Sequence, residues 1–155
     1  MPNEELLVEI LECQHDTKVG HITLNSPETL NSLTMNMVNK ISNLLDDWEV
    51  DPQIKMILVS GSGEKAFCAG GDIRALYESM CSPEGPVFAE SFFESEYRLD
   101  YKLHNFSKPI ISLLDGIVMG GGAGLMFGSS YKIATERTKF AMPEIGVGLF
   151  PDVGF

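Results

Sequence analysis

Residues 54–80 read IKMILVSGSGEKAFCAGGDIRALYESM, and the predicted fold depends most on this stretch. Its first seven residues form an apolar run of strand length, which is typical of a strand buried in a parallel sheet. Small residues follow at 66–71, and an amphipathic segment begins directly after Asp72. The stretch therefore predicts a buried strand, a tight glycine-containing turn and a short helix over 73–80.

A second stretch has the same order of features. KPIISLLDGIV at 108–118 predicts one more buried strand, and GGGAGLMFGSS at 120–130 predicts a glycine-rich turn that becomes helical. Strands alternate with helices along the whole chain, which favours an α/β fold. The other predicted elements are strands at 6–12 and 20–26, a helix within 27–51 capped by Thr34, a helix at 87–106, strand-like segments within 131–144 and a loop at 145–155.

Composition narrows the classes of function. The 155 residues contain 44% hydrophobic and 21% charged residues, which is ordinary for one globular domain. The formal net charge of −11 disfavours nucleic acids and anionic membranes as partners, because both bind to basic surfaces. No apolar run approaches the roughly 20 residues that span a bilayer. The acidic start, MPNEELLVEILE, predicts neither a signal peptide nor a transit peptide.

Cysteine and histidine give no sign of a metal or disulfide framework. The three cysteines, Cys13, Cys68 and Cys81, are odd in number and form no CxxC pair. The three histidines have no metal-ligand spacing. We therefore expect no metal site, and a reducing compartment fits best. Cys68 has no histidine nearby in sequence to activate it, so we interpret it as a packing residue rather than a nucleophile.

The two glycine turns, CAGGD at 68–72 and MGGGAG at 119–124, could serve chemistry or packing. Glycine lets a ligand approach the peptide N–H groups, because no side chain covers them. Two N–H groups from two such turns can bind one oxygen and stabilise charge that develops on a carbonyl. Simple packing of glycine explains either turn alone equally well. GSGEKA at 61–66 fits a dinucleotide fingerprint, but residues 67–71 separate it from the helix, so a Rossmann site is disfavoured.

Two acids near the end lie in apolar sequence. FAMPEIGVGLFPDVG at 140–154 contains Glu144 and Asp152. A carboxylate in such surroundings can act as a general base, a general acid or a nucleophile. The alternative is an ordinary surface acid, and we favour the site interpretation for Glu144.

Three stretches together resemble the crotonase (enoyl-CoA hydratase/isomerase) superfamily. They are SGSGEKAFCAGGDIRALYE at 60–78, KPIISLLDGIVMGGGAGL at 108–125 and the acidic stretch at 140–154. The resemblance implies a crotonase-like ββα spiral fold. It also implies that residues 1–155 form the N-terminal part of the domain, an acyl-CoA-binding core without its C-terminal helical portion.

The resemblance also implies roles for single residues. The N–H groups of Gly71 and Gly121 would form an oxyanion hole for the thioester. The backbone of Ala69 would lie beside the adenine of coenzyme A, and Gly70 and Asp72 belong to the same substrate-binding turn. Coenzyme A would enter as part of the substrate, with no cofactor bound permanently.

Four positions separate the branches of the superfamily. Enoyl-CoA hydratases use two glutamates, the first in a GGGxE pattern, and here that position is Gly124. The second is kept as Glu144. Asp152 in FPDVG and Glu96 in FFESEYRL are similar to acids of the 3-hydroxyisobutyryl-CoA hydrolases. The resemblance therefore implies thioester hydrolysis of 3-hydroxyisobutyryl-CoA or a similar 3-hydroxyacyl-CoA, with Glu144 as nucleophile or general base.

Two alternatives stay open, an enoyl-CoA hydratase or isomerase and a catalytically inactive acyl-CoA-binding fragment. The hydrolase interpretation implies a role in valine catabolism. We expect a cytoplasmic protein, or a mitochondrial matrix protein if a transit peptide has been removed. The expected partner is a small acyl-CoA, with no nucleic acid and no membrane, and the chain could form a homo-oligomer.

Overall fold

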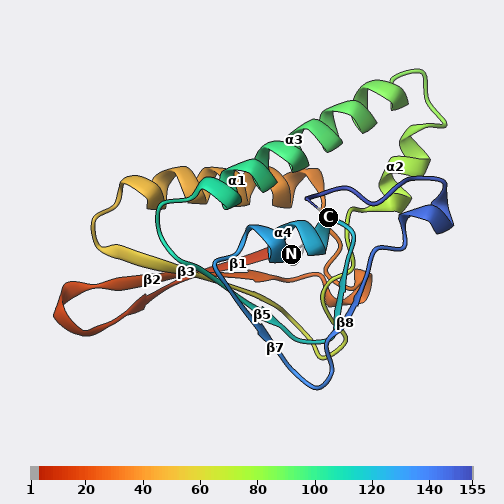
Figure 1. Cartoon of the computed structure of the whole chain (residues 1–155). Helices are drawn as coiled ribbons and strands as arrows, with labels where there is room; N and C mark the ends of the chain where they lie inside the picture. The colour runs from red at the N-terminus through yellow and green to blue at the C-terminus, as the bar shows by residue number, and fades with distance from the viewer. Residues whose placement is uncertain (1–3, 155) are drawn as a thin grey trace.

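The computed structural model describes residues 4–154 and contains two sheets with helices packed around them (Figure 1). Residues 1–3 of the expected acidic N-terminus and Phe155, the last residue of the expected final loop, lie outside the described residues. The larger sheet has five strands in the order β1-β2-β3-β5-β7, and the smaller has three in the order β4-β6-β8. The α/β expectation is confirmed.

The larger sheet is mostly parallel. β1 (Leu6–Glu12) pairs antiparallel with β2 (Lys18–Leu24), and β2 is parallel to β3 (Ile54–Gly61). β3 is parallel to β5 (Ile110–Leu114), which is parallel to β7 (Tyr131–Ala134). The apolar run at 54–60 is therefore the buried parallel strand that was expected. β2 begins two residues before the predicted strand at 20–26, because a single short turn at 14–16 already reverses the chain.

The sequence pattern did not predict a second sheet, although the predicted strand over 108–118 and the strand-like segments within 131–144 overlap two of its three strands. Its strands are β4 (Ala66–Cys68), β6 (Ile117–Met119) and β8 (Lys139–Ala141), all parallel. The prediction of one strand over 108–118 was wrong, because the chain turns at Gly116 between β5 and β6. Gly116 has φ +78°, and a Cβ there would lie 2.8 Å from the Ala66 nitrogen. Each strand of the smaller sheet follows a strand of the larger one, which gives the repeated strand–strand–helix course of the spiral.

The described part of the chain has four α-helices packed on this frame: α1 (Met35–Val50), α2 (Ile73–Ser79), α3 (Gly85–Asn105) and α4 (Gly121–Gly128). Figure 1 shows α1 and α3 side by side along the larger sheet. Thr34 caps α1 as expected, since its Oγ1 accepts a hydrogen bond from the Met37 nitrogen at 3.1 Å. α3 begins at Gly85 rather than 87, because Pro86 is favourable in the first helical turn.

The hydrophobic core lies between these helices and the sheets. It carries the inner face of α1, the buried residues of β2 and β3, and Phe67 of β4. Phe67 is fully buried, so the stretch that precedes the first glycine turn is anchored in the core. The core therefore fixes the position of both glycine turns, which emerge at the ends of β4 and β6.

Candidate active site

The two glycine turns, one face of α3 and the segment 143–152 enclose a cavity of about 140 Å³. Backbone from both turns, aromatic side chains and three carboxylates line this cavity. The lining residues are Ala69, Gly70, Gly71, Ile73, Leu76, Phe92, Phe93, Glu96, Gly120, Gly121, Pro143, Glu144, Val147, Leu149 and Asp152. Residues from four separate parts of the chain thus meet at one place.

The two glycine turns touch each other. A Cβ on Gly70 would lie 3.1 Å from the Met119 carbonyl oxygen and 3.4 Å from the Gly121 nitrogen. Gly70 has φ +106° and Gly120 has φ +51°, a region of backbone space that residues with side chains rarely adopt. The close approach and the backbone conformation together require glycine at these positions.

The segment before α1 holds the first turn in place. The Leu33 nitrogen donates to the Gly70 carbonyl at 2.7 Å, and the Asp72 nitrogen donates to the Leu33 carbonyl at 2.9 Å. The Ala69 nitrogen also donates to the Leu30 carbonyl at 3.0 Å. These three hydrogen bonds pair the backbone polar groups on one side of the turn.

The N–H groups of Gly71 and Gly121 are not used in this way. Gly121 is the first residue of α4, so its N–H has no partner within the helix. Neither N–H donates a hydrogen bond in the loops, turns and caps of residues 4–154. Both residues line the cavity, so the site has two backbone donors that are available to a ligand.

Two glutamates are buried beside these donors. Glu96 of α3 is 4% exposed and Glu144 is 9% exposed. Glu96 Oε1 lies where a side chain on Gly121 would stand, and Glu144 Oε1 lies 3.2 Å from an ideal Cβ on Gly120. Within residues 4–154, Glu96 Oε1 and Glu144 Oε2 have no hydrogen-bond partner. Buried carboxylate oxygens are costly to leave unpaired, which points to a ligand or to protonation.

Burial and neighbouring charge change the acidity of this group of residues. Burial is the main cause that raises the pKa of Glu96 to about 8, and the negative charges of Asp100, Asp152 and Glu144 add to it. The Tyr97 hydroxyl donates a hydrogen bond to Asp152 Oδ2. Burial and then this bond raise the pKa of Tyr97 above its usual value. Burial and the neighbouring charges thus both favour the neutral acid form of Glu96.

Seven of the eight residues predicted for the site lie in the cavity wall. They are Ala69, Gly70, Gly71, Glu96, Gly121, Glu144 and Asp152. Asp72 is not among them: its Oδ1 accepts from the Ala75 nitrogen at 3.0 Å and so caps α2. Its predicted part in substrate binding stays a prediction.

Cys68 behaves as the packing residue that was expected. It is fully buried, and burial raises the pKa of its thiol to about 12. A thiol with so high a pKa is a poor nucleophile at neutral pH.

The sequence interpretation missed Tyr97 and Asp100 of α3. Asp100 is 7% exposed and follows Glu96 by one helical turn, on the same side of the helix. That spacing from a predicted site acid was the signal that could have found it. Burial, followed by the charge of Asp152, raises the pKa of Asp100 to about 7.

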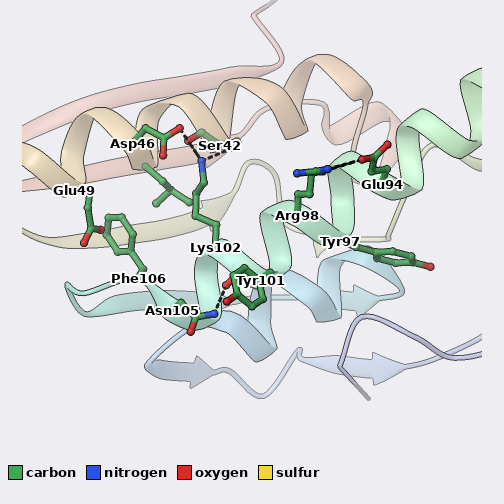
Figure 2. Close-up of a pocket in the computed structure, with 11 residues that line it drawn as sticks. Ser42, Asp46, Glu49, Glu94, Tyr97, Arg98, Tyr101, Lys102, Asn105 and Phe106 are labelled. Atoms are coloured by element: carbon green, nitrogen blue, oxygen red, sulfur yellow. Dashed lines mark hydrogen bonds and ion pairs between the residues drawn. The ribbon is translucent and has the colours of Figure 1, made fainter.

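A larger, open groove of about 790 Å³ runs between α1 and α3 (Figure 2). Its polar side chains mostly pair with one another. Figure 2 shows Lys102 bound to Ser42 and Asp46, and Arg98 bound to Glu94. The groove has neither the glycine turns nor the buried site acids, so size alone does not make it the better candidate.

Within residues 4–154 no cluster of three metal-ligating side chains occurs. The same residues contain no helix of sufficient length and apolar character to cross a bilayer.

Known proteins resemble the chain in both sequence and fold. The 3-hydroxyisobutyryl-CoA hydrolase, mitochondrial, of Danio rerio is 48% identical over 137 residues, which are 88% of this chain and 35% of that protein. The human protein of the same name is 46% identical over 151 residues, 97% of this chain and 37% of that protein. The chain thus spans about a third of the length of these curated relatives. Their names place them in mitochondria, so the cytoplasmic expectation finds no support.

Solved structures share the fold. A carnitinyl-CoA dehydratase from Mycobacterium thermoresistibile has a TM-score of 0.90 and 42% identity, over 98% of this chain and 43% of that one. An enoyl-CoA hydratase from Rhodobacter sphaeroides has a TM-score of 0.83 and 38% identity, over 95% of this chain and 42% of that one. The sequence profile described as Enoyl-CoA hydratase/isomerase matches residues 19–155. The chain therefore belongs to the enoyl-CoA hydratase/isomerase family, the crotonase superfamily.

Proposed function

We propose that this chain carries the acyl-CoA-binding and catalytic core of a thioester hydrolase for 3-hydroxyisobutyryl-CoA or a similar 3-hydroxyacyl-CoA. The observation that carries the proposal is the meeting of Gly71, Gly121 and Glu144 around one cavity. Two free backbone donors beside a buried carboxylate suit a reaction in which charge develops on a carbonyl oxygen. The relatives named as 3-hydroxyisobutyryl-CoA hydrolases support the choice of substrate.

In the proposed reaction the N–H groups of Gly71 and Gly121 donate to the thioester carbonyl oxygen. Glu144 then attacks the carbonyl carbon, the C–S bond breaks, and coenzyme A leaves as a thiolate that takes a proton from solvent. Water then cleaves the acyl-glutamyl anhydride to the hydroxy acid and free Glu144. In the second route Glu144 takes a proton from the water that attacks the thioester directly. Glu96 and Asp152, which line the same cavity, would hold the substrate hydroxyl and the attacking water.

The position of Gly124 argues against hydration as the main activity. Hydratases would need a second acid there, and a Cβ on Gly124 would lie 2.6 Å from Asp100 Oδ1. No side chain fits at this position unless Asp100 moves. A catalytically inactive acyl-CoA-binding protein would leave the buried Glu96 and Glu144 without use, although their unpaired oxygens are costly.

The test is release of free thiol from 3-hydroxyisobutyryl-CoA by the longest polypeptide that contains this segment. We expect turnover in the wild type, and loss of turnover with retained acyl-CoA binding in Glu144→Gln. Crotonyl-CoA is assayed alongside, and hydration of it without thiol release would overturn the proposal. Hydroxylamine trapping tells the routes apart, because only an anhydride at Glu144 gives a hydroxamate at that residue.

The same proposal extends to cellular context. Since the relatives carry "mitochondrial" in their names, we propose the mitochondrial matrix as the compartment and valine catabolism as the pathway. Coenzyme A would be present only as part of the substrate. The homo-oligomer stays a prediction, which light scattering of the purified protein tests.

A further inference from the structure

Asp100 is a buried acid that the proposed reaction does not use. It lies one turn after Glu96 on α3, and its Oδ2 has no hydrogen-bond partner within residues 4–154. Both of its carboxylate oxygens face Gly124 of α4, since an ideal Cβ there would lie 2.6 Å from Oδ1 and 2.9 Å from Oδ2. The carboxyl group thus stands in the space that a side chain at position 124 would occupy.

Asp100 lines a second cavity that shares one wall residue with the proposed site. This cavity, of about 420 Å³, is lined by Tyr97, Asp100, His104, Phe150, Asp152, Val153 and Gly154. Asp152 lines both this cavity and the one with the glycine turns. Asp100 therefore lines the same cavity as the hydrogen-bonded pair of Tyr97 and Asp152.

The groups that face Asp100 are nearly all acidic or neutral. α3 contributes Glu96, Tyr97 and, at the exposed outer rim, His104, and the C-terminal loop contributes Asp152. α4 contributes no titratable group, because its sequence is GGAGLMFG. Asp100 forms no ion pair with any other residue of the described range 4–154. Glu96, Asp100 and Asp152 therefore interact as like charges, and ionisation of one disfavours ionisation of the others.

We propose that Asp100 is a positioning residue whose carboxyl group, packed against Gly124, sets the charge that Glu96 carries in the site. This inference rests on the proposed function for its effect on turnover, but the coupling of the two acids does not depend on turnover. When Asp100 loses its proton, its charge resists ionisation of Glu96 and so keeps Glu96 a hydrogen-bond donor over a wider range of pH. Gly124 is the partner residue, since it leaves the room that this carboxyl group needs.

The coupling is measured directly by carbon-13 NMR of the side-chain carboxyl groups, with Glu96 assigned by the loss of its signal in Glu96→Gln. In Asp100→Asn we expect the midpoint of Glu96 to fall by about one pH unit, as removal of a neighbouring like charge does. Glu94→Gln is the matched control on the same helix, because Glu94 is exposed and pairs with Arg98. An unmoved midpoint in Asp100→Asn overturns the inference.

Two variants at the small residues of α4 test the geometry. Gly124→Ala places a Cβ against the Asp100 carboxyl group, and Gly128→Ala places one equally tightly against the apolar Leu103 Cβ at 2.5 Å. We expect Gly124→Ala to shift the pH midpoint of the Glu96 titration, whereas Gly128→Ala should leave this midpoint unchanged. Equal midpoints in the two variants contradict the role of Gly124.

Thiol release from 3-hydroxyisobutyryl-CoA then links the coupling to catalysis. We expect the midpoint of the kcat/KM–pH profile to fall in Asp100→Asn by the same amount as the NMR midpoint, with kcat at the optimum within about threefold of wild type. A profile that stays in place while the NMR midpoint moves contradicts the positioning role. Absence of thiol release in the wild type overturns the proposed function, and the NMR titration still decides the coupling.

Discussion

Glu96 Oε1 occupies the space that a side chain on Gly121 would need. α3 and the start of α4 can therefore pack this closely only because position 121 has no side chain. The same contact puts a buried carboxyl group next to one of the two free backbone donors of the cavity. The Glu96 carboxyl group and the Gly121 backbone are thus held together by close packing, not by a hydrogen bond between them.

Gly121→Ala tests this relationship. The added Cβ must displace Glu96 or tilt the first turn of α4, and either change misplaces the Gly121 N–H. We expect kcat/KM for thiol release to fall by about 10²-fold, the usual effect of losing one oxyanion donor. Gly146→Ala is the control, because a Cβ at Gly146 meets nothing within 4 Å. Similar losses in both variants would argue that any alanine near the site disturbs it.

Tyr97→Phe tests the partner of Asp152. The phenol donates to Asp152 Oδ2, and a hydrogen bond to a charged group is worth about 1.5–3 kcal/mol. We expect kcat to fall about tenfold or more, while KM changes little. The reason is that the variant keeps the Asp152 carboxylate in the site but removes the hydrogen bond that holds it in position. Tyr101→Phe, one turn later on α3 and 73% exposed, should keep full activity. Unchanged kcat in Tyr97→Phe would mean that Asp152 needs no such support.

Much of this arrangement follows from sequence patterns. Thr34 at the start of α1 and the apolar run at 54–60 have local signals, namely a capping residue and a buried strand, and both were predicted correctly. The glycine turns also have a local signal, consecutive glycines after a strand, but packing explained either turn alone equally well, and only the resemblance to the crotonase superfamily implied a role for them.

Features that depend on distant contacts were missed. β4 and β6 have three residues each, too short for a periodic signal, and they form because β4 pairs with β6 and β6 pairs with β8. Asp100 looks like an ordinary surface acid on an amphipathic helix, and only the absence of a side chain at Gly124 allows it to be buried. A sequence pattern shows which residues share one face of a helix. Whether a side chain on that face is buried depends on the residues of the helix that packs against it.

Asn31→Ala tests the support of the first glycine turn. Asn31 is fully buried, with its Oδ1 accepting from the Ser26 nitrogen and its Nδ2 donating to the Ser62 and Ala66 carbonyls. Its φ of +55° also suits asparagine better than alanine. We expect the free energy of unfolding to fall by about 3 kcal/mol, roughly one for each lost hydrogen bond, as measured by urea denaturation. Asn39→Ala, at an exposed position of α1, should change it by no more than about 0.5 kcal/mol.

Glu96 should also make the folded chain less stable as pH rises. Its pKa is about 8 in the folded chain against 4.5 for an unperturbed glutamate, mainly because it is buried. Below pH 4.5 both folded and unfolded chains keep the proton, so burial has no ionisation cost. Between pH 4.5 and 8 the unfolded chain releases a proton that the folded chain retains, and the free energy of unfolding falls as pH increases. Above pH 8 both chains have released this proton, and the free energy of unfolding falls no further on its account.

Glu96→Gln removes this contribution, because glutamine keeps the shape of the protonated acid and does not ionise. Relative to wild type, the variant should gain stability between pH 5 and 8.5, on the order of a few kcal/mol, in urea denaturation at each pH. Asp100 still titrates in the variant, so its pH dependence becomes weaker without vanishing. Glu94→Gln should retain the wild-type slope, since Glu94 is exposed on the same helix. If the free energy of unfolding falls with pH equally steeply in Glu96→Gln and in the wild type, another buried acid of the site controls the pH dependence. Asp100 is then the first residue to substitute.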